Sequence, residues 1–118
     1  MMQGNRLSDR SILITGGAGF IGSHLVERLL DENEVFVLDN FSSGIRKTVL
    51  PYLNRPNFHL LDADLLDAGN LETLLAGKDM VFHLSANPIV RLGIEDTRIH
   101  LEQNVLATCN LLEAMRKA

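Results

Sequence analysis

The stretch LITGGAGFIGSHLVERLL, residues 13–30, decides the fold of this chain. It begins with apolar and β-branched residues that predict a strand, passes through four glycines, and continues with the spacing of a helix. Apolar residues recur at helical intervals after the turn, namely Ile21, Leu25, Leu29 and Leu30. A strand that turns through glycines into a helix indicates either a ligand site or a simple glycine-rich turn.

The rest of the chain repeats this alternation of apolar runs and helical spacing, which is typical of successive βαβ units around a parallel sheet. The predicted strands are Ser11 to Thr15, Val35 to Asp39, Phe58 to Asp62 and Met80 to Leu84. Right-handed crossovers give the strand order 3-2-1-4. The predicted fold class is therefore α/β, the first half of a Rossmann-type doubly wound parallel sheet, with a ligand crevice at the carboxyl ends of strands one and four.

Three further helical segments follow from apolar spacing and capping residues. Two short ones are predicted near residues 47–53 and 70–76, the second closed by Gly77. The longest is predicted over residues 97–117, with Asp96 as its N-cap. One stripe runs along this helix, formed by Leu101, Val105, Thr108, Leu112 and Met115.

Composition and charge restrict the classes of function. The 118 residues suit one domain, 46% of them are hydrophobic, and the net charge of −4 gives no general attraction to nucleic acid or anionic lipid. We expect a cytoplasmic protein, because the first residues lack an apolar signal core and no apolar run approaches a membrane span. Cys109 is the single cysteine, which excludes a disulfide within the chain and predicts a packed thiol.

The glycines of the first turn have the chemistry of a phosphate site. Gly16, Gly19 and Gly22 follow a strand and open a helix in the spacing G-x-x-G-x-x-G. A tight turn, close approach of the backbone to a pyrophosphate and close helix packing each exclude a Cβ, while the helix N-terminus offers free N–H groups to the anion. Taken alone, the three glycines are equally compatible with a turn that binds nothing.

Asp39 adds the context that favours a ligand. It ends the second predicted strand, 17 residues after Gly22, where dinucleotide sites place an acid that binds the adenosine ribose hydroxyls. The acid would repel the 2′-phosphate of NADP, and no arginine directly follows it. The sequence therefore predicts NAD as the cofactor.

Five stretches together resemble one family, the extended short-chain dehydrogenase/reductases, in particular the nucleotide-sugar epimerases and dehydratases. They are TGGAGFIGSHL (15–25), VLDNFSSGIRK (37–47), DADL (62–65), VFHLSA (81–86) and EQNVLATCNLLEAMR (102–116). They span nearly the whole chain in order and at matching intervals. The segment DNFSSG is most similar to UDP-glucose 4-epimerases, and related dehydratases have similar sequences there.

The resemblance implies roles at the matching positions. The backbone of Phe20 and Ile21 would bind the pyrophosphate, next to the three glycines. The adenosine side would be held by Asp39, Asn40, Ser42, Ser43 and Gly44, and the adenine would be flanked by Asp64 and Leu65. The nicotinamide ribose would be lined by Leu84, Ser85 and Ala86. Asn104 would project from the last helix toward the cofactor side of the sheet.

Structural alternatives stay open for several of these residues. Phe20 is also compatible with packing at the helix start, Leu84 and Ala86 with the core, and Asn104 with a bond to a neighbouring loop. Asp62 and Asp64 could suggest a D-x-D metal pair, but no metal site is predicted because no nucleotide-sugar transferase context accompanies them. His83, inside a strand, is predicted to be a core histidine with its hydrogen bonds satisfied.

No catalytic residue is predicted in this chain. Family enzymes oxidise a sugar hydroxyl with Tyr-x-x-x-Lys and a nearby Ser or Thr, whereas Tyr52, the single tyrosine, has Pro56 four residues on. We therefore expect residues 1–118 to be an NAD-binding Rossmann segment truncated before the catalytic and substrate-binding parts, and inactive alone. The full-length parent would act on a nucleotide sugar.

Two interpretations remain. The favoured one is the cofactor-binding part of an epimerase or dehydratase that oxidises sugar C4 transiently, and the other is a non-catalytic module that senses NAD or completes a partner's sheet. In either, the fourth predicted strand would be an apolar sheet edge, so self-association is expected and a homo-oligomer stays open.

Overall fold

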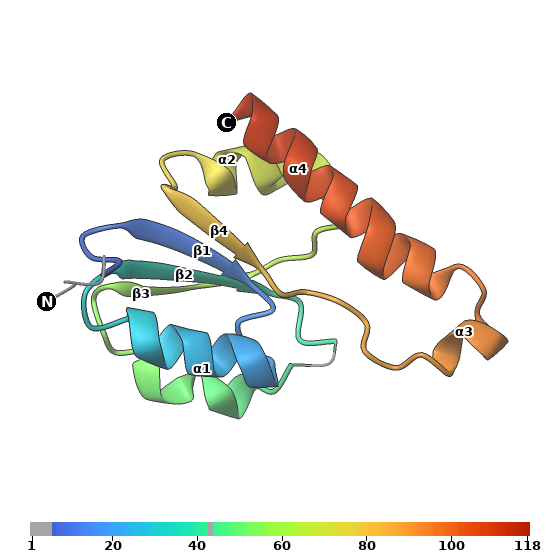
Figure 1. The fold of residues 1–118 in the computed structure, drawn as a ribbon, viewed down its shortest axis with the longest axis horizontal. Helices are drawn as coiled ribbons and strands as arrows, with labels where there is room; N and C mark the ends of the chain where they lie inside the picture. Colours follow the sequence, from blue (N-terminus) through green and yellow to red (C-terminus); the bar gives the residue numbers. More distant parts are fainter. Residues whose placement is uncertain (1–5, 43) are drawn as a thin grey trace, which may run out of the picture.

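The computed structural model describes residues 6–42 and 44–118. Four parallel strands form one sheet in the order β3-β2-β1-β4, which confirms the predicted topology (Figure 1). The strands are β1 (Ser11–Thr15), β2 (Glu34–Asp39), β3 (Phe58–Asp62) and β4 (Met80–His83). Two predicted bounds differ by one residue, since β2 begins at Glu34 and β4 ends at His83.

The sheet has a separate apolar core on each face because neighbouring residues of a strand point to opposite sides. Ile12 and Ile14 of β1 pack on one face with Val26 of helix α1 (Phe20–Leu29). Leu13 packs on the other, toward α2 (Leu71–Leu75) and α4 (Ala107–Lys117). Figure 1 shows α1 below the sheet and α2 and α4 above it. The central strands are thus covered on both faces, as parallel sheets require.

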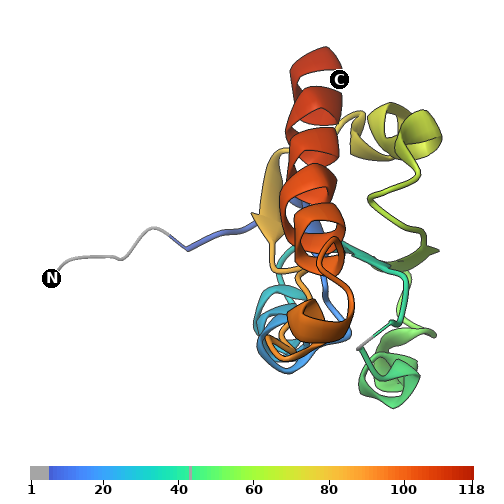
Figure 2. The ribbon, with the colours of Figure 1, turned by 90° about the vertical axis from the view of Figure 1, so that its right-hand side faces the viewer.

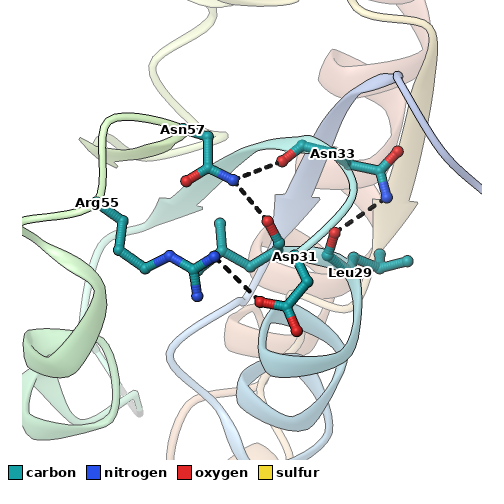
Figure 3. Close-up of polar contacts among 6 residues, drawn as sticks. Leu29, Asp31, Asn33, Arg55 and Asn57 are labelled. Carbon is teal, nitrogen blue, oxygen red and sulfur yellow. Dashed lines mark hydrogen bonds and ion pairs between the residues drawn. The ribbon is translucent and has the colours of Figure 1, made fainter.

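Asparagine side chains donate hydrogen bonds to backbone carbonyls at the carboxyl end of α1, which lack partners within the helix. Asn33 Nδ2 donates to the carbonyl of Leu29 at 3.0 Å, and Asn57 Nδ2 donates to the carbonyls of Leu30 and Asn33 (Figure 3). Asn57 directly precedes β3, so these bonds tie the end of the helix to the start of the sheet. They hold the end of α1 where the chain turns into β2.

The long helix is interrupted by a different helical geometry. A π-helical segment, η4 (Leu101–Leu106), leads into α4, and its N-cap is His100 rather than the predicted Asp96. Asp96 ends α3 (Leu92–Glu95) instead, and its Oδ1 accepts from the backbone N–H of Arg98 in the turn that follows. The π-helix adds a residue to the turn, so positions before and after it do not share one 3.6-residue stripe. The predicted stripe is not the buried face of this helix.

The buried face of α4 is formed by Ala107, Leu111 and Ala114 instead. Leu111 lies in the same core as Leu71 and Leu75 of α2, and Figure 2 shows the two helices next to each other. Small alanines allow the close approach. The apolar residues of the predicted stripe stay exposed, namely Leu101, Val105, Leu112 and Met115. Cys109 is also exposed, so the packed thiol was wrong.

The remaining segments are short. Residues predicted as one helix near 47–53 form two 3₁₀ turns, η1 (Arg46–Thr48) and η2 (Leu50–Tyr52). A third, η3 (Ala68–Asn70), precedes α2, and Gly77 after α2 has φ +75°, which fits its predicted role at the helix end. Helix α3 (Leu92–Glu95) follows β4. Within the described ranges, no helix has the length and apolar character to span a bilayer.

Candidate functional site

The glycine turn between β1 and α1 is held by contacts that leave no room for side chains. Gly16 adopts φ +70°, and a Cβ there would lie 2.8 Å from the backbone of Leu84 and Ser85. A Cβ on Gly22 would overlap the carbonyl oxygen of Gly16. Gly16 N–H donates to the Leu38 carbonyl at 2.9 Å. These two glycines are therefore required by the packing of the protein itself.

Gly19 is different, because the protein alone does not require it. Its φ of −80° and ψ of 179° are extended backbone that any residue adopts. An added Cβ would have one close neighbour, the Gly16 carbonyl oxygen at 3.2 Å. Gly19 lines the cleft at the N-terminus of α1, where a bound phosphate would approach the backbone. Packing therefore constrains Gly19 less than it constrains Gly16 and Gly22.

Asp39, at the carboxyl end of β2, joins the two loops that meet at the cleft. Asp39 as a residue is 7% exposed, and its Oδ2 accepts from the Ala18 N–H of the glycine turn at 3.1 Å. Its Oδ1 accepts from the Phe41 N–H at 2.7 Å. A carboxylate has about four acceptor positions, so both oxygens keep capacity for ribose hydroxyls. The acid that the sequence places here thus also organises the site.

The loop after β2 continues this wall of the cleft. Asn40 Oδ1 accepts from Ser42 N–H at 2.9 Å, and Asn40 Nδ2 donates to Asp64 Oδ2 at 3.0 Å. The other oxygen of Asp64 accepts from Leu66 N–H at 2.9 Å. The predicted adenosine residues therefore hold one another in place. Ser43 lies outside the described residues.

Neither acid of the Asp62 and Asp64 pair is arranged for a metal. Asp62 Oδ2 lies 2.7 Å from Arg46 Nη2 in an exposed ion pair. The guanidinium of Arg46 also stacks on the Phe41 ring, 4.1 Å from its centroid. Asp64 bonds to Asn40 as described above, so each carboxylate has a different partner on the chain.

The opposite wall of the cleft is the segment that follows β4. Leu84, Ser85 and Ala86 line it, and the backbone N–H groups of the first two donate to Thr15 Oγ1 at 3.0 and 3.2 Å. Thr15 ends β1 and is fully buried. The carboxyl ends of β1 and β4 are therefore bonded directly to each other, as expected for a crevice at the ends of these strands.

These walls line a cleft that is open to solvent. Predicted site residues that line it are Gly16, Gly19, Asp39, Asn40, Ser42, Gly44, Asp64, Leu65, Leu84, Ser85 and Ala86. Segments from four strand ends thus meet as the sequence indicated. The predicted residues that do not line it are Phe20, Ile21, Gly22 and Asn104.

Those four residues have other positions. The side chains of Phe20 and Ile21 are exposed, so Ile21 does not pack on the sheet although it belongs to the apolar spacing of this helix. Gly22 packs on the glycine turn. Asn104 Oδ1 accepts from Asn87 N–H at 2.7 Å, which matches the alternative of a bond to a neighbouring loop. Backbone groups of the first turn of α1 remain available to a ligand, because a helix leaves its first N–H groups unpaired.

Sequence reasoning missed five lining residues, Leu38, Ala63, Leu66, Gln103 and Ala107. Leu38, Ala63 and Leu66 are direct neighbours of predicted residues, so counting both sides of each strand end would have found them. Gln103 and Ala107 belong to the long helix, and no sequence signal indicates which helix face meets a cleft. Only the packing of α4 brings them there.

A family model described as GDP-mannose 4,6 dehydratase matches residues 13–118, which contain every wall of this cleft. The chain belongs to this family. The match of this chain to nucleotide-sugar epimerases and dehydratases confirms the resemblance found in the sequence. The UDP-glucose 4-epimerase of Mycolicibacterium smegmatis is 41% identical over 109 residues, covering 90% of this chain and 34% of that protein.

Solved structures agree with the fold and the family. A dTDP-glucose 4,6-dehydratase from Streptomyces venezuelae, with NAD bound, matches with a TM-score of 0.82 and 37% identity, covering 88% of this chain and 35% of that one. The Thermus thermophilus UDP-glucose 4-epimerase complex with NAD matches with a TM-score of 0.77 and 38% identity, covering 91% of this chain and 34% of that one. The chain thus spans about a third of the length of these relatives.

Proposed function

We propose that this chain is the NAD-binding part of a nucleotide-sugar epimerase or dehydratase. The observation that carries the proposal is the cleft, in which Gly16 and Gly19 at the N-terminus of α1 face Asp39 and Asp64 on one side and residues 84–86 on the other. Relatives that hold NAD have the same fold over this region. The glycine turn supplies unpaired N–H groups for a pyrophosphate.

The proposed contacts divide NAD into two halves. On the adenosine half, Asp39 binds the ribose, the loop containing Asn40, Ser42 and Gly44 borders it, and Asp64 and Leu65 flank the adenine. The backbone of Phe20 and Ile21 binds the pyrophosphate. On the other half, residues 84–86 border the nicotinamide ribose, and Asn104 acts indirectly, since it holds the backbone of Asn87.

NAD is favoured over NADP by the charges around Asp39. The described residues that line the cleft include two aspartates and no lysine or arginine. Arg46 follows the loop but is paired with Asp62, and it does not line the cleft. A 2′-phosphate would therefore meet a buried carboxylate without a compensating cation.

The proposed reaction is the hydride exchange that UDP-glucose 4-epimerase-like enzymes perform at sugar C4. Bound NAD supplies the hydride acceptor, and this chain binds and orients it. We infer that the catalytic residues and the nucleotide-sugar site belong to a longer protein, because the chain spans about a third of its relatives. A reading frame that continues beyond Ala118 to Tyr-x-x-x-Lys supports this; a stop codon there refutes it and leaves the non-catalytic module.

Calorimetric titration of the purified chain with NAD and NADP tests the cofactor site. We expect NAD binding in the wild type, weaker NADP binding, and at least about tenfold weaker NAD binding in Gly19→Ala, since a Cβ would stand where the phosphate approaches. The free energy of unfolding should change by less than about 1 kcal/mol, because the backbone of Gly19 suits any residue.

Gly69→Ala is the matched control. A Cβ there would have only Asp67 Oδ1 within reach, at 3.5 Å, and Gly69 lies outside the cleft, so both binding and stability should stay near those of the wild type. A wild-type chain that does not bind NAD, or a Gly19→Ala chain that binds it equally well, would refute the proposed site.

A further inference from the structure

His83 connects β1 to the long helix α4 through a chain of hydrogen bonds. It is the last residue of β4, directly before the segment that lines the cleft. Its Nδ1 lies 2.6 Å from Thr15 Oγ1, and its Nε2 lies 2.8 Å from Thr108 Oγ1 in α4. The ring thus links β1, β4 and the long helix, and no role in binding or catalysis has been assigned to it above.

The direction of each bond follows from counting donors and acceptors. The Thr108 hydroxyl donates its one proton to the Asn104 carbonyl at 2.7 Å, so it can only accept from the ring, and His83 Nε2 must carry a proton. A neutral ring protonated at Nε2 has Nδ1 as an acceptor. Thr15 therefore donates to Nδ1, while its oxygen accepts from Leu84 and Ser85 N–H.

The Thr15 hydroxyl makes every hydrogen bond that it can make. Thr15 Oγ1 has one proton and two lone pairs, and the three bonds use all of them. Thr15 is fully buried, so water cannot replace a lost partner. Leu84 N–H also donates to the Thr15 backbone carbonyl at 3.1 Å. The Thr15 hydroxyl, which the His83 ring orients, therefore adds to that bond for Leu84 and accepts the N–H of Ser85.

A second set of bonds links the same two elements. Asn104 Oδ1 accepts from Asn87 N–H at 2.7 Å, and Asn87 Nδ2 donates to Gln103 Oε1 at 2.8 Å. The backbone carbonyl of Asn104 thus accepts from the Thr108 hydroxyl, while its side chain accepts from the segment after β4. Both sets end in the π-helical turn η4, a geometry frequent at functional sites.

We infer that Thr15, His83 and Thr108 form a positioning relay, which sets the backbone of residues 84–86 against the long helix and so shapes the nicotinamide half of the cleft. His83 and Thr108 are positioning residues, because they act through Thr15 and the segment after β4. The effect on ligand binding rests on the proposed function, whereas the hydrogen-bond pattern does not.

The pattern is tested first without any substitution. Long-range ¹⁵N–¹H NMR spectra of the ¹⁵N-labelled chain at neutral pH report which ring nitrogen of His83 carries the proton. We expect a neutral ring with the proton on Nε2. A ring protonated on Nδ1, or one that exchanges freely between both forms as in solvent, would overturn the relay.

The consequence for binding is tested with Thr108→Val and Thr108→Ser, titrated with NAD and with ADP. Valine removes the hydroxyl at similar volume, so we expect about tenfold weaker NAD binding, the amount that one hydrogen bond contributes, with ADP binding unchanged. Serine restores the hydroxyl and should restore NAD binding. Thr73→Val, at an exposed position of α2, is the matched control and should change neither NAD binding nor ADP binding.

The outcomes separate the two proposals. Equal NAD affinity in Thr108→Val and the wild type, or equal losses for NAD and ADP, would overturn the relay's role at the nicotinamide half. A wild-type chain that binds neither NAD nor ADP would refute the proposed function instead. The tautomer of His83 would then still decide whether the relay exists.

Discussion

Gly16→Ala should destabilise the chain far more than Gly77→Ala, although both glycines have almost the same backbone. Gly16 has φ +70° and Gly77 has φ +75°, in the left-handed region that disfavours a side chain. A Cβ on Gly77 would have nothing within 4 Å. A Cβ on Gly16 would lie 2.8 Å from the Leu84 carbonyl carbon and the Ser85 nitrogen.

The expected magnitudes follow from these two differences. The left-handed conformation costs an alanine about 1–2 kcal/mol, and reduced freedom of the unfolded chain returns about 0.4–1 kcal/mol. Gly77→Ala should therefore cost about 1 kcal/mol. Gly16→Ala adds an overlap with backbone that cannot rotate away, which costs about 1–3 kcal/mol more. Its total of about 2–4 kcal/mol is a large part of the 5–15 kcal/mol by which domains are stable.

Urea unfolding followed by circular dichroism measures both variants on the same chain. Because the substitution is chemically identical, effects on the unfolded state cancel in the difference between the two free energies of unfolding. We expect a difference of at least about 1 kcal/mol, with Gly16→Ala the less stable. Equal stabilities would refute the close contact between the glycine turn and the segment after β4, and with it the shape of the cleft.

Two further predictions concern pH and association. Burial lowers the pKa of His83 below its ordinary value of 6.5, so the unfolded chain binds that proton more tightly than the folded one. The free energy of unfolding of the wild type should therefore fall relative to that of His83→Gln as the pH drops below 6.5, whereas above pH 6.5 the two free energies should run parallel. Parallel curves at every pH would contradict the lowered pKa of His83. β4 is an edge of the described sheet, so light scattering of the chain should show a mass that rises with concentration, and a monomer at high concentration would count against association through this edge.

Local signals predicted most of the sheet, and together with the family resemblance they named 11 of the 16 described residues that line the cleft. Strand bounds were right to within a residue, because β-branched runs alternate with helical spacing and Gly16 marks the end of the first strand. Asp39 and Asp64 were found because dinucleotide sites and the family resemblance place acids at strand ends. Carboxyl ends of parallel strands meet at one sheet edge, so residues placed there by sequence come together in space.

The long helix shows where such reasoning fails. Hydrophobicity alone selects the larger side chains Leu101, Val105 and Leu112, yet these are exposed and the small Ala107 and Ala114 are buried. Close packing against α2 and the π-helical turn decide the face, and neither has a local signature in the sequence. In the same way Cys109 is exposed, because it lies on the face turned away from the core.

The sequence by itself determined the strand order, the glycine turn and the acid beside it, because these depend on backbone conformation and on residues close along the chain. Only the tertiary structure decided that Gly19 is the glycine that packing leaves unexplained, and that His83 joins Thr15 to Thr108 across 68 and 25 positions of chain. Such contacts arise when separate elements pack against each other, and hydrogen-bond partners far apart along the chain leave no periodic pattern in the sequence.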